Sequence, residues 1–134
     1  MVLAQQFFVE RPLLLDLDAR DARHILAARS WCLFRRSQQD PLPRIRSHLQ
    51  SGPAAMRFAM LMDAVQQLWP DGFAIHRPCC PAASIDEIML AQLIRLALAG
   101  QRPAFDWLLH EMLGQEARDL LYARAQGLYR YQLL

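Results

Sequence analysis

Three residue types are missing from this sequence. It contains no lysine, asparagine or threonine, and all fifteen of its basic residues are arginine. Because lysine and asparagine have A-rich codons, this composition is typical of a GC-rich, bacterial genome and requires no selection for arginine chemistry. Disorder of the whole chain is excluded, since disordered chains are poor in apolar residues and 54% of this chain is hydrophobic. The net charge of +2 is too small to imply nucleic-acid binding by itself.

The sequence also lacks a long, uninterrupted apolar run. The longest apolar stretch, at 88–99, contains Gln92 and Arg95 and is shorter than the roughly 20 residues that a membrane-spanning helix needs. Arg11 and Pro12 interrupt the apolar run near the start, and no basic region precedes it as in a signal peptide. Three cysteines, two of them adjacent, do not form the paired framework of a secreted protein. We therefore expect a cytoplasmic protein with no membrane partner.

Glycine and proline divide the chain into segments with helical apolar periodicity. A length of 134 residues fits one domain with its own core, so we expect a single helical domain covering 1–134. Residues 1–16 are expected to form an N-terminal arm, and residues 44–50 to add one short turn. The expected helices cover about 18–37, 53–69, 85–99, 103–113 and 115–131. With short connections and no paired strands, these segments predict an all-α fold, a compact bundle of about five helices.

Two of these segments, 53–69 and 85–99, are apolar on nearly every side, which predicts helices buried between others. Asp18 is the expected N-cap of the first helix, and Ser84 is that of the third, where Glu87 would complete a capping box. The side chains that we expect to be almost fully buried are Met60, Leu61, Val65, Ile88, Leu93 and Leu96.

Arg29 falls near the middle of the apolar face of the first helix. A buried guanidinium requires a partner, so we expect Arg29 to pair with a carboxylate. Asp21 lies too far round the same helix, which leaves Asp63 and Glu111 as the expected partners.

The stretch HRPCCPAASIDE, at 76–87, holds more reactive groups than any other part of the chain. His76, Cys79 and Cys80 offer one nitrogen and two sulfur ligands, whereas a closed zinc site needs four. The fourth ligand would have to come from elsewhere in the fold, from His48, His110 or Asp86. Free cysteines are also common as small buried hydrophobes. We favour a loop that leads into the third helix, and a thiol- or zinc-responsive regulator is the alternative.

No motif indicates an enzyme, since a glycine-rich phosphate loop, a nucleophile elbow and a helical pair of metal-binding histidines are all missing. A weaker alternative is a nucleic-acid-binding regulator. It would use four arginines that have only Asp40 among them, namely Arg35, Arg36, Arg44 and Arg46. A solvated surface is the favoured interpretation of this basic run.

The last two expected helices carry aromatic residues outside their main apolar faces. Tyr122 and Tyr129 share a second face of the fifth helix, and Trp107 lies opposite the main apolar stripe of the fourth. Tyrosine and tryptophan are enriched in protein interfaces, although core packing also explains such residues. We therefore expect a non-enzymatic protein-interaction or regulatory module that needs no cofactor and forms a homo-oligomer.

The second half of the chain resembles a small uncharacterised helical family from alphaproteobacteria. The resemblance rests on the pair Cys79-Cys80, on SIDE at 84–87 before a Leu/Ala-rich helix, and on LLHEMLG at 108–114. In that family too, a Cys-Cys pair precedes a capped helix that bears Asp-Glu. The resemblance implies a helical fold and draws attention to the two cysteines, but it implies no activity.

Overall fold

The computed structural model describes residues 12–130. Within this range the chain forms one short 3-10 helix and α-helices, without a β-strand. The elements are η1 (Leu14–Asp16), α2 (Ala19–Arg36), α3 (Leu42–Leu49), α4 (Gly52–Leu68), α5 (Ile85–Leu98), α6 (Arg102–Leu109) and α7 (Gln115–Gln126). The predicted all-α class is confirmed. Residues 1–11 of the expected arm lie outside the described residues.

The helix starts follow the local capping chemistry. The Asp18 side chain accepts a hydrogen bond from the backbone N–H of Arg20 at 2.9 Å, and the Ser51 hydroxyl accepts one from Ala54 at 3.1 Å. Ser84 and Glu87 form the expected capping box at the start of α5. Two helix ends differ from the prediction: α6 ends at Leu109, four residues before the expected 113, and α7 ends at Gln126, five residues before the expected 131. The expected turn at 44–50 is the full helix α3, which has proline in its first turn.

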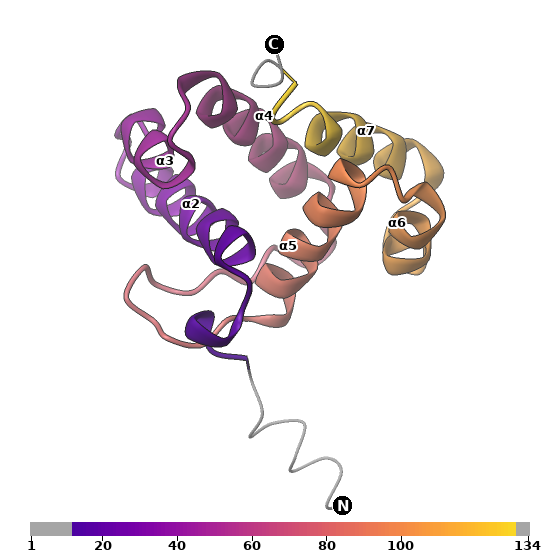
Figure 1. The fold of residues 1–134 in the computed structure, drawn as a ribbon, viewed down its shortest axis with the longest axis horizontal. Coiled ribbons are helices and arrows are strands. Elements are labelled where there is room, and N and C mark those ends of the chain that lie inside the picture. The colour runs from indigo at the N-terminus through magenta and orange to yellow at the C-terminus, as the bar shows by residue number, and fades with distance from the viewer. Residues whose placement is uncertain (1–11, 131–134) are drawn as a thin grey trace, which may run out of the picture.

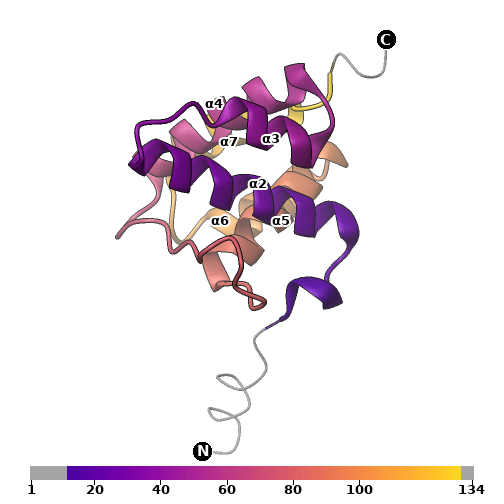
Figure 2. The same cartoon turned by 90° about the vertical axis from the view of Figure 1, so that its left-hand side faces the viewer.

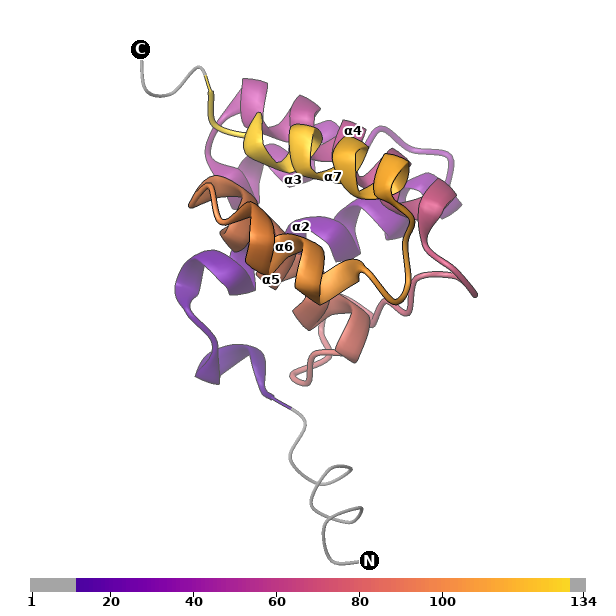
Figure 3. The same ribbon diagram turned by 90° about the vertical axis from the view of Figure 1, so that its right-hand side faces the viewer.

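The helices surround a common core in a closed order. Helices α2, α3, α4, α7 and α5 each pack against the next, α5 also packs against α2, and α6 lies against α5 and α7 (Figure 1). Figure 2 shows the side on which α3 lies next to α2. The opposite side, where α7 runs along α4 and α6 lies next to α5, is seen in Figure 3. Every helix in residues 12–130 is too short or too polar to cross a bilayer.

The core is built from the inner faces of all six α-helices. The largest fully buried apolar side chains are Phe58, Phe105, Ile25, Ile45, Leu61, Met62, Leu90, Leu93, Ile94, Leu109 and Leu121.

The predicted burial of α4 and α5 is correct only in part. Leu61, Val65 and Leu93 are fully buried, as expected. Ile88 and Leu96 are half-buried, and Met60 is 46% exposed, so the prediction for Met60 is wrong. The reason is the place of α4 in the ring of helices: it packs against α3 and α7 and leaves one apolar stripe in contact with water.

The segment just before α2 is bound to the domain by backbone hydrogen bonds. Leu14 donates to the carbonyl of Pro81 at 2.8 Å, and Ala83 donates to that of Pro12 at 2.9 Å. Leu14 and Leu17 pack against a small apolar cluster that includes Ile25. Residues 12–17 therefore hold the loop that precedes α5.

Candidate functional site

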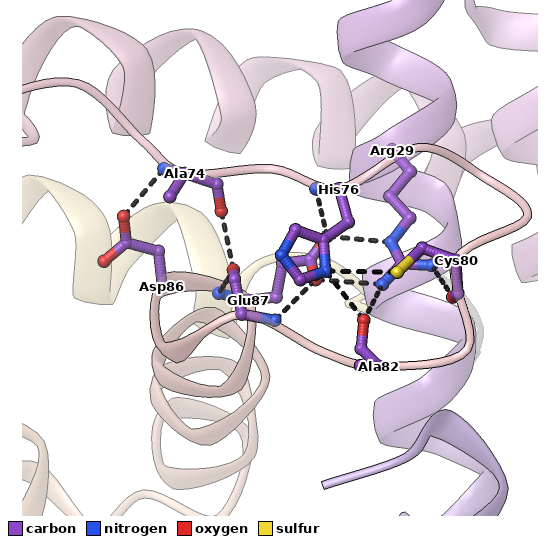
Figure 4. A network of polar contacts seen from close by, with 8 residues as sticks. Arg29, Ala74, His76, Cys80, Ala82, Asp86 and Glu87 are labelled. Atoms are coloured by element: carbon purple, nitrogen blue, oxygen red, sulfur yellow. Dashed lines mark hydrogen bonds and ion pairs between the residues drawn. The ribbon is translucent and has the colours of Figure 1, made fainter. Parts of the chain in front are cut away.

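The loop between α4 and α5 is organised around a buried ion pair (Figure 4). Arg29, from α2, donates from Nε and Nη2 to the two carboxylate oxygens of Glu87, from α5, at 2.8 and 3.0 Å. Both side chains are fully buried. The prediction that Arg29 pairs with an acid is confirmed, but the expected partners Asp63 and Glu111 were wrong. The packing of α5 against α2 brings the first turn of α5 to Arg29, and Asp63 instead lies 3.7 Å from Arg35 at the surface.

The same two side chains also bind the backbone of the loop. Arg29 donates to the carbonyls of Cys80 and Ala82 at 2.7 and 2.9 Å, and the Glu87 carboxylate accepts from the N–H groups of His76 and Ser84 at 3.1 and 2.9 Å. Among the described residues, neither side chain of the pair has a buried polar atom without a partner. A buried network in which every polar atom has a hydrogen-bond partner is typical of a structural role.

The electrostatics of Glu87 reflect two opposing causes. Burial alone would raise the pKa of Glu87, but the hydrogen bonds from Arg29, Ser84 and His76 and the charge of Arg29 together lower this pKa below its ordinary value. Glu87 is therefore ionised at neutral pH and carries the charge that Arg29 requires.

The three candidate ligands of the loop are only partly brought together. The Nδ1 atom of His76 lies 2.7 Å from the carbonyl oxygen of Ala82 and 3.5 Å from Sγ of Cys80, whereas Cys79 is exposed. No three or more His, Cys, Asp or Glu side chains within residues 12–130 are grouped so that they could hold a metal ion. The arrangement therefore offers one imidazole–thiol contact.

The three candidate interface aromatics lie at different places. Trp107 is 78% exposed on α6 and stacks on the ring of His110, with the ring centres 5.1 Å apart. Tyr122 is half-buried and meets Phe105 edge to face. The hydroxyl of the half-buried Tyr129 lies 2.6 Å from Nε2 of His24. The two tyrosines thus take part in packing within the chain, and Trp107 is the aromatic residue of the three that faces solvent.

Two of the four clustered arginines interact with nearby aromatic rings. The guanidinium of Arg35 lies 5.1 Å from the centre of the Trp31 ring, and that of Arg44 lies 5.8 Å from the centre of the Phe34 ring. All four arginines are exposed, and nucleic-acid binding at this run stays a prediction.

An exposed apolar groove lies between α4 and α7, and we call it the α4–α7 groove. It encloses about 730 Å³. Its walls are positions 53, 56, 57 and 60 of α4 and positions 120, 123, 124 and 127 at and just after α7. Each set follows the spacing i, i+3, i+4, i+7 of a single helix face. Its large apolar side chains contact water, with exposed fractions of 58% for Met56, 46% for Met60 and 39% for Leu120.

The rim of the α4–α7 groove is basic. Arg57 lies on the α4 side, where its Nη1 donates to the carbonyl of Gly127 at 2.8 Å. Arg124, in the last turn of α7, and Arg130, beyond the end of α7, lie on the other side. Among the residues that the structure describes, no aspartate or glutamate lines the groove.

The sequence interpretation expected the segment 53–69 to be buried on nearly every side, and it therefore missed Met56 and Met60 as surface residues. In the structure Leu121 and Leu128 are buried, and Leu120 faces the groove. A signal was present, because α4 carries more apolar residues than one packed face requires. An excess of this kind indicates either a central helix or a second, exposed face.

No model of a known protein family, no curated protein and no solved structure matches this chain. The functional inference therefore depends on the geometry of the chain itself.

Proposed function

We propose that this protein is a non-enzymatic interaction module, and that the α4–α7 groove is the surface on which it receives a helix of a partner protein. The observation that supports this proposal is the pair of facing stripes, one on each helix, that leave Met56, Met60 and Leu120 in contact with water. A contiguous exposed apolar patch with a polar rim is typical of a binding surface.

The dimensions of the groove suit a helix. Positions 53 to 60 span about 10 Å along α4, which is two helical turns. A docked helix could place apolar residues at i, i+3 or i+4, and i+7 between the two stripes, in the manner of other helix-in-groove complexes. Methionine side chains adapt to different partner shapes, so Met56 and Met60 suit a surface of this kind.

A small amphipathic molecule fits the groove less well. Ligand pockets normally bury 70–90% or more of a small molecule's surface. In the α4–α7 groove, Met56 and Met60 are about half exposed. An acyl chain or a similar ligand would therefore remain largely in contact with water, whereas a helix would cover the groove with its own apolar face.

A selection from a library of displayed helical peptides tests the proposal without knowledge of the natural partner. Peptides are selected on the full chain and counter-selected on a Met56→Gln, Met60→Gln double variant. We expect enrichment of sequences with an apolar i, i+3 or i+4, i+7 pattern, and weak binding of these sequences to the double variant. Enrichment of peptides that bind both proteins equally would contradict the proposal.

A second candidate, thiol-responsive regulation, is supported by one contact, that between Sγ of Cys80 and Nδ1 of His76 at 3.5 Å. Oxidation or metal binding at Cys80 would disturb the loop carbonyls that Arg29 holds. Replacement of Cys80 by Ser, with Cys79→Ser as the control, tests this candidate. A response to oxidant or zinc that survives Cys80→Ser would contradict it.

Further expectations from the sequence remain proposals. These are a cytoplasmic location, self-association, a relation to the alphaproteobacterial family that the second half of the chain resembles, and, as the weaker alternative, nucleic-acid binding at the basic run.

A further inference from the structure

We propose that the partner helix is acidic, with glutamate or aspartate along the side of its apolar stripe that faces α7. This inference rests on the proposed function of the α4–α7 groove and adds the chemistry of the occupant. The lining contains Arg124 and Arg130 on the α7 side and no acidic residue, so an ordinary apolar helix would leave these two charges unmatched at the edge of the interface.

The positions of Arg124 and Arg130 determine where the acids would lie. Arg57 is on the α4 wall, and its hydrogen bond to the Gly127 carbonyl fixes the guanidinium beside the groove. Arg124 and Arg130 follow the other wall, and neither forms an ion pair with any residue of 12–130. Because Arg124 lies in the last turn of α7 and Arg130 lies beyond its end, their charges match acids spread along a helix better than one carboxylate at a single point.

The same charges disfavour a second copy of this chain as the occupant. In a symmetric contact, each copy offers the same patch to the other. Such a contact through the α4–α7 groove would bring Arg57, Arg124 and Arg130 of one copy near the same residues of the partner. Like charges in opposition weaken an interface, so an acidic helix from a different protein is the better match.

Three synthetic helical peptides with the same leucine stripe at i, i+4 and i+7 test the charge of the occupant. They carry Glu, Gln or Arg at the flanking positions, and fluorescence anisotropy measures their binding to the full chain. We expect the Glu peptide to bind about tenfold more tightly than the Gln peptide in about 50 mM salt, and the Arg peptide to bind more weakly than both. The preference should shrink in about 500 mM salt, because exposed charges are then screened.

Variants of the protein test whether the preference for the Glu peptide arises at the groove. Arg124→Gln with Arg130→Gln should reduce binding of the Glu peptide to the level of the Gln peptide and leave the Gln peptide unchanged. Arg46→Gln with Arg77→Gln is the matched control, because it also removes two charges, at exposed sites outside the groove. Equal loss of the Glu preference in both variants would overturn the assignment to the groove.

The remaining outcomes separate this inference from the proposed function. Equal binding of all three peptides would overturn the acidic partner but leave the groove as a helix-binding surface, whereas failure of all three would overturn both. If the chain's own C-terminal residues compete with the peptide for the groove, a Leu133→Ser, Leu134→Ser variant should bind the Gln peptide more tightly than the unaltered chain does. Peptide-induced dissociation of a dimer, seen by sedimentation, would show that a second copy is the occupant. Either result overturns the inference.

Discussion

Arg29 of α2 and Glu87 of α5 are 58 residues apart in sequence and meet through two hydrogen bonds in the interior of the protein. The same two side chains also form hydrogen bonds with the backbone of the segment that connects α4 to α5. One residue pair therefore fixes the packing of α5 against α2, the start of α5 and the path of a loop that has no regular secondary structure.

Removal of one member of this pair should destabilise the fold strongly. We expect Glu87→Gln to lower the free energy of unfolding by about 3–5 kcal/mol, because it leaves a buried guanidinium without a countercharge. The exposed pair of Arg35 and Asp63 supplies the control, since Asp63→Asn should cost below about 1 kcal/mol. Urea unfolding at pH 7 measures both values. Similar costs for the two variants would contradict the importance of the buried pair.

The free energy of unfolding should also decrease as the pH is lowered, because of His24. Burial, with smaller contributions from the charges of Arg20 and Arg23, lowers the pKa of His24 to about 4 from an ordinary value of 6.5. The unfolded chain therefore binds a proton below pH 6.5 that the folded chain does not bind until about pH 4, and stability decreases as the pH falls through this window. A pKa difference of this size corresponds to roughly 3 kcal/mol.

Urea unfolding between pH 7.5 and pH 4.5 measures this effect. In a His24→Gln variant the decrease between pH 6.5 and pH 5 should become smaller. The remaining decrease belongs to His48, because burial and the charge of Arg44 lower the pKa of His48 as well. An unchanged slope in the variant would assign the pH dependence to another group.

Two apolar residues of neighbouring helices should respond differently to truncation. Leu93→Ala, in the packed core, should cost about 2–5 kcal/mol, because the cavity that it leaves cannot collapse fully. Met60→Ala, at the groove, should cost below about 1 kcal/mol, because its side chain is already in contact with water. Thermal or urea unfolding of the two variants compares them. A cost for Met60→Ala equal to that for Leu93→Ala would place Met60 in the core.

Trp107 provides a test of self-association. Its ring is 78% exposed, so Trp107→Ala should change the free energy of unfolding by less than about 1 kcal/mol. If α6 forms the interface of a homo-oligomer, the same variant should dissociate it, and sedimentation velocity measures this change. Dissociation without destabilisation would assign Trp107 to an interface, whereas an unchanged oligomer would exclude it.

The elements that were predictable from the sequence are those fixed by local chemistry. Asp18, Ser51 and Ser84 mark helix starts because a side-chain oxygen beside the first turn satisfies a free backbone N–H. The capping box of Ser84 and Glu87 requires only a spacing of three residues. These features do not depend on how the helices pack.

The features that the sequence did not reveal depend on packing between distant segments. Burial of Arg29 indicated an acidic partner, but the choice of Glu87 over Asp63 follows from the contact of α2 with α5. Likewise, the apolar surplus of α4 is compatible with a central helix and with an exposed face, and only the ring order of the helices distinguishes the two. The α4–α7 groove was therefore not predictable from a single sequence.

The central claim, that the α4–α7 groove binds an acidic amphipathic helix, is tested most directly by NMR of methionine methyl groups. Met56 and Met60 line the groove, while Met62, Met89 and Met112 lie in or against the core and serve as internal controls. On addition of the Glu-flanked peptide, we expect saturable shifts of the Met56 and Met60 methyl signals and little change in the other three. Shifts of the control methyls with none at Met56 and Met60 would contradict the account.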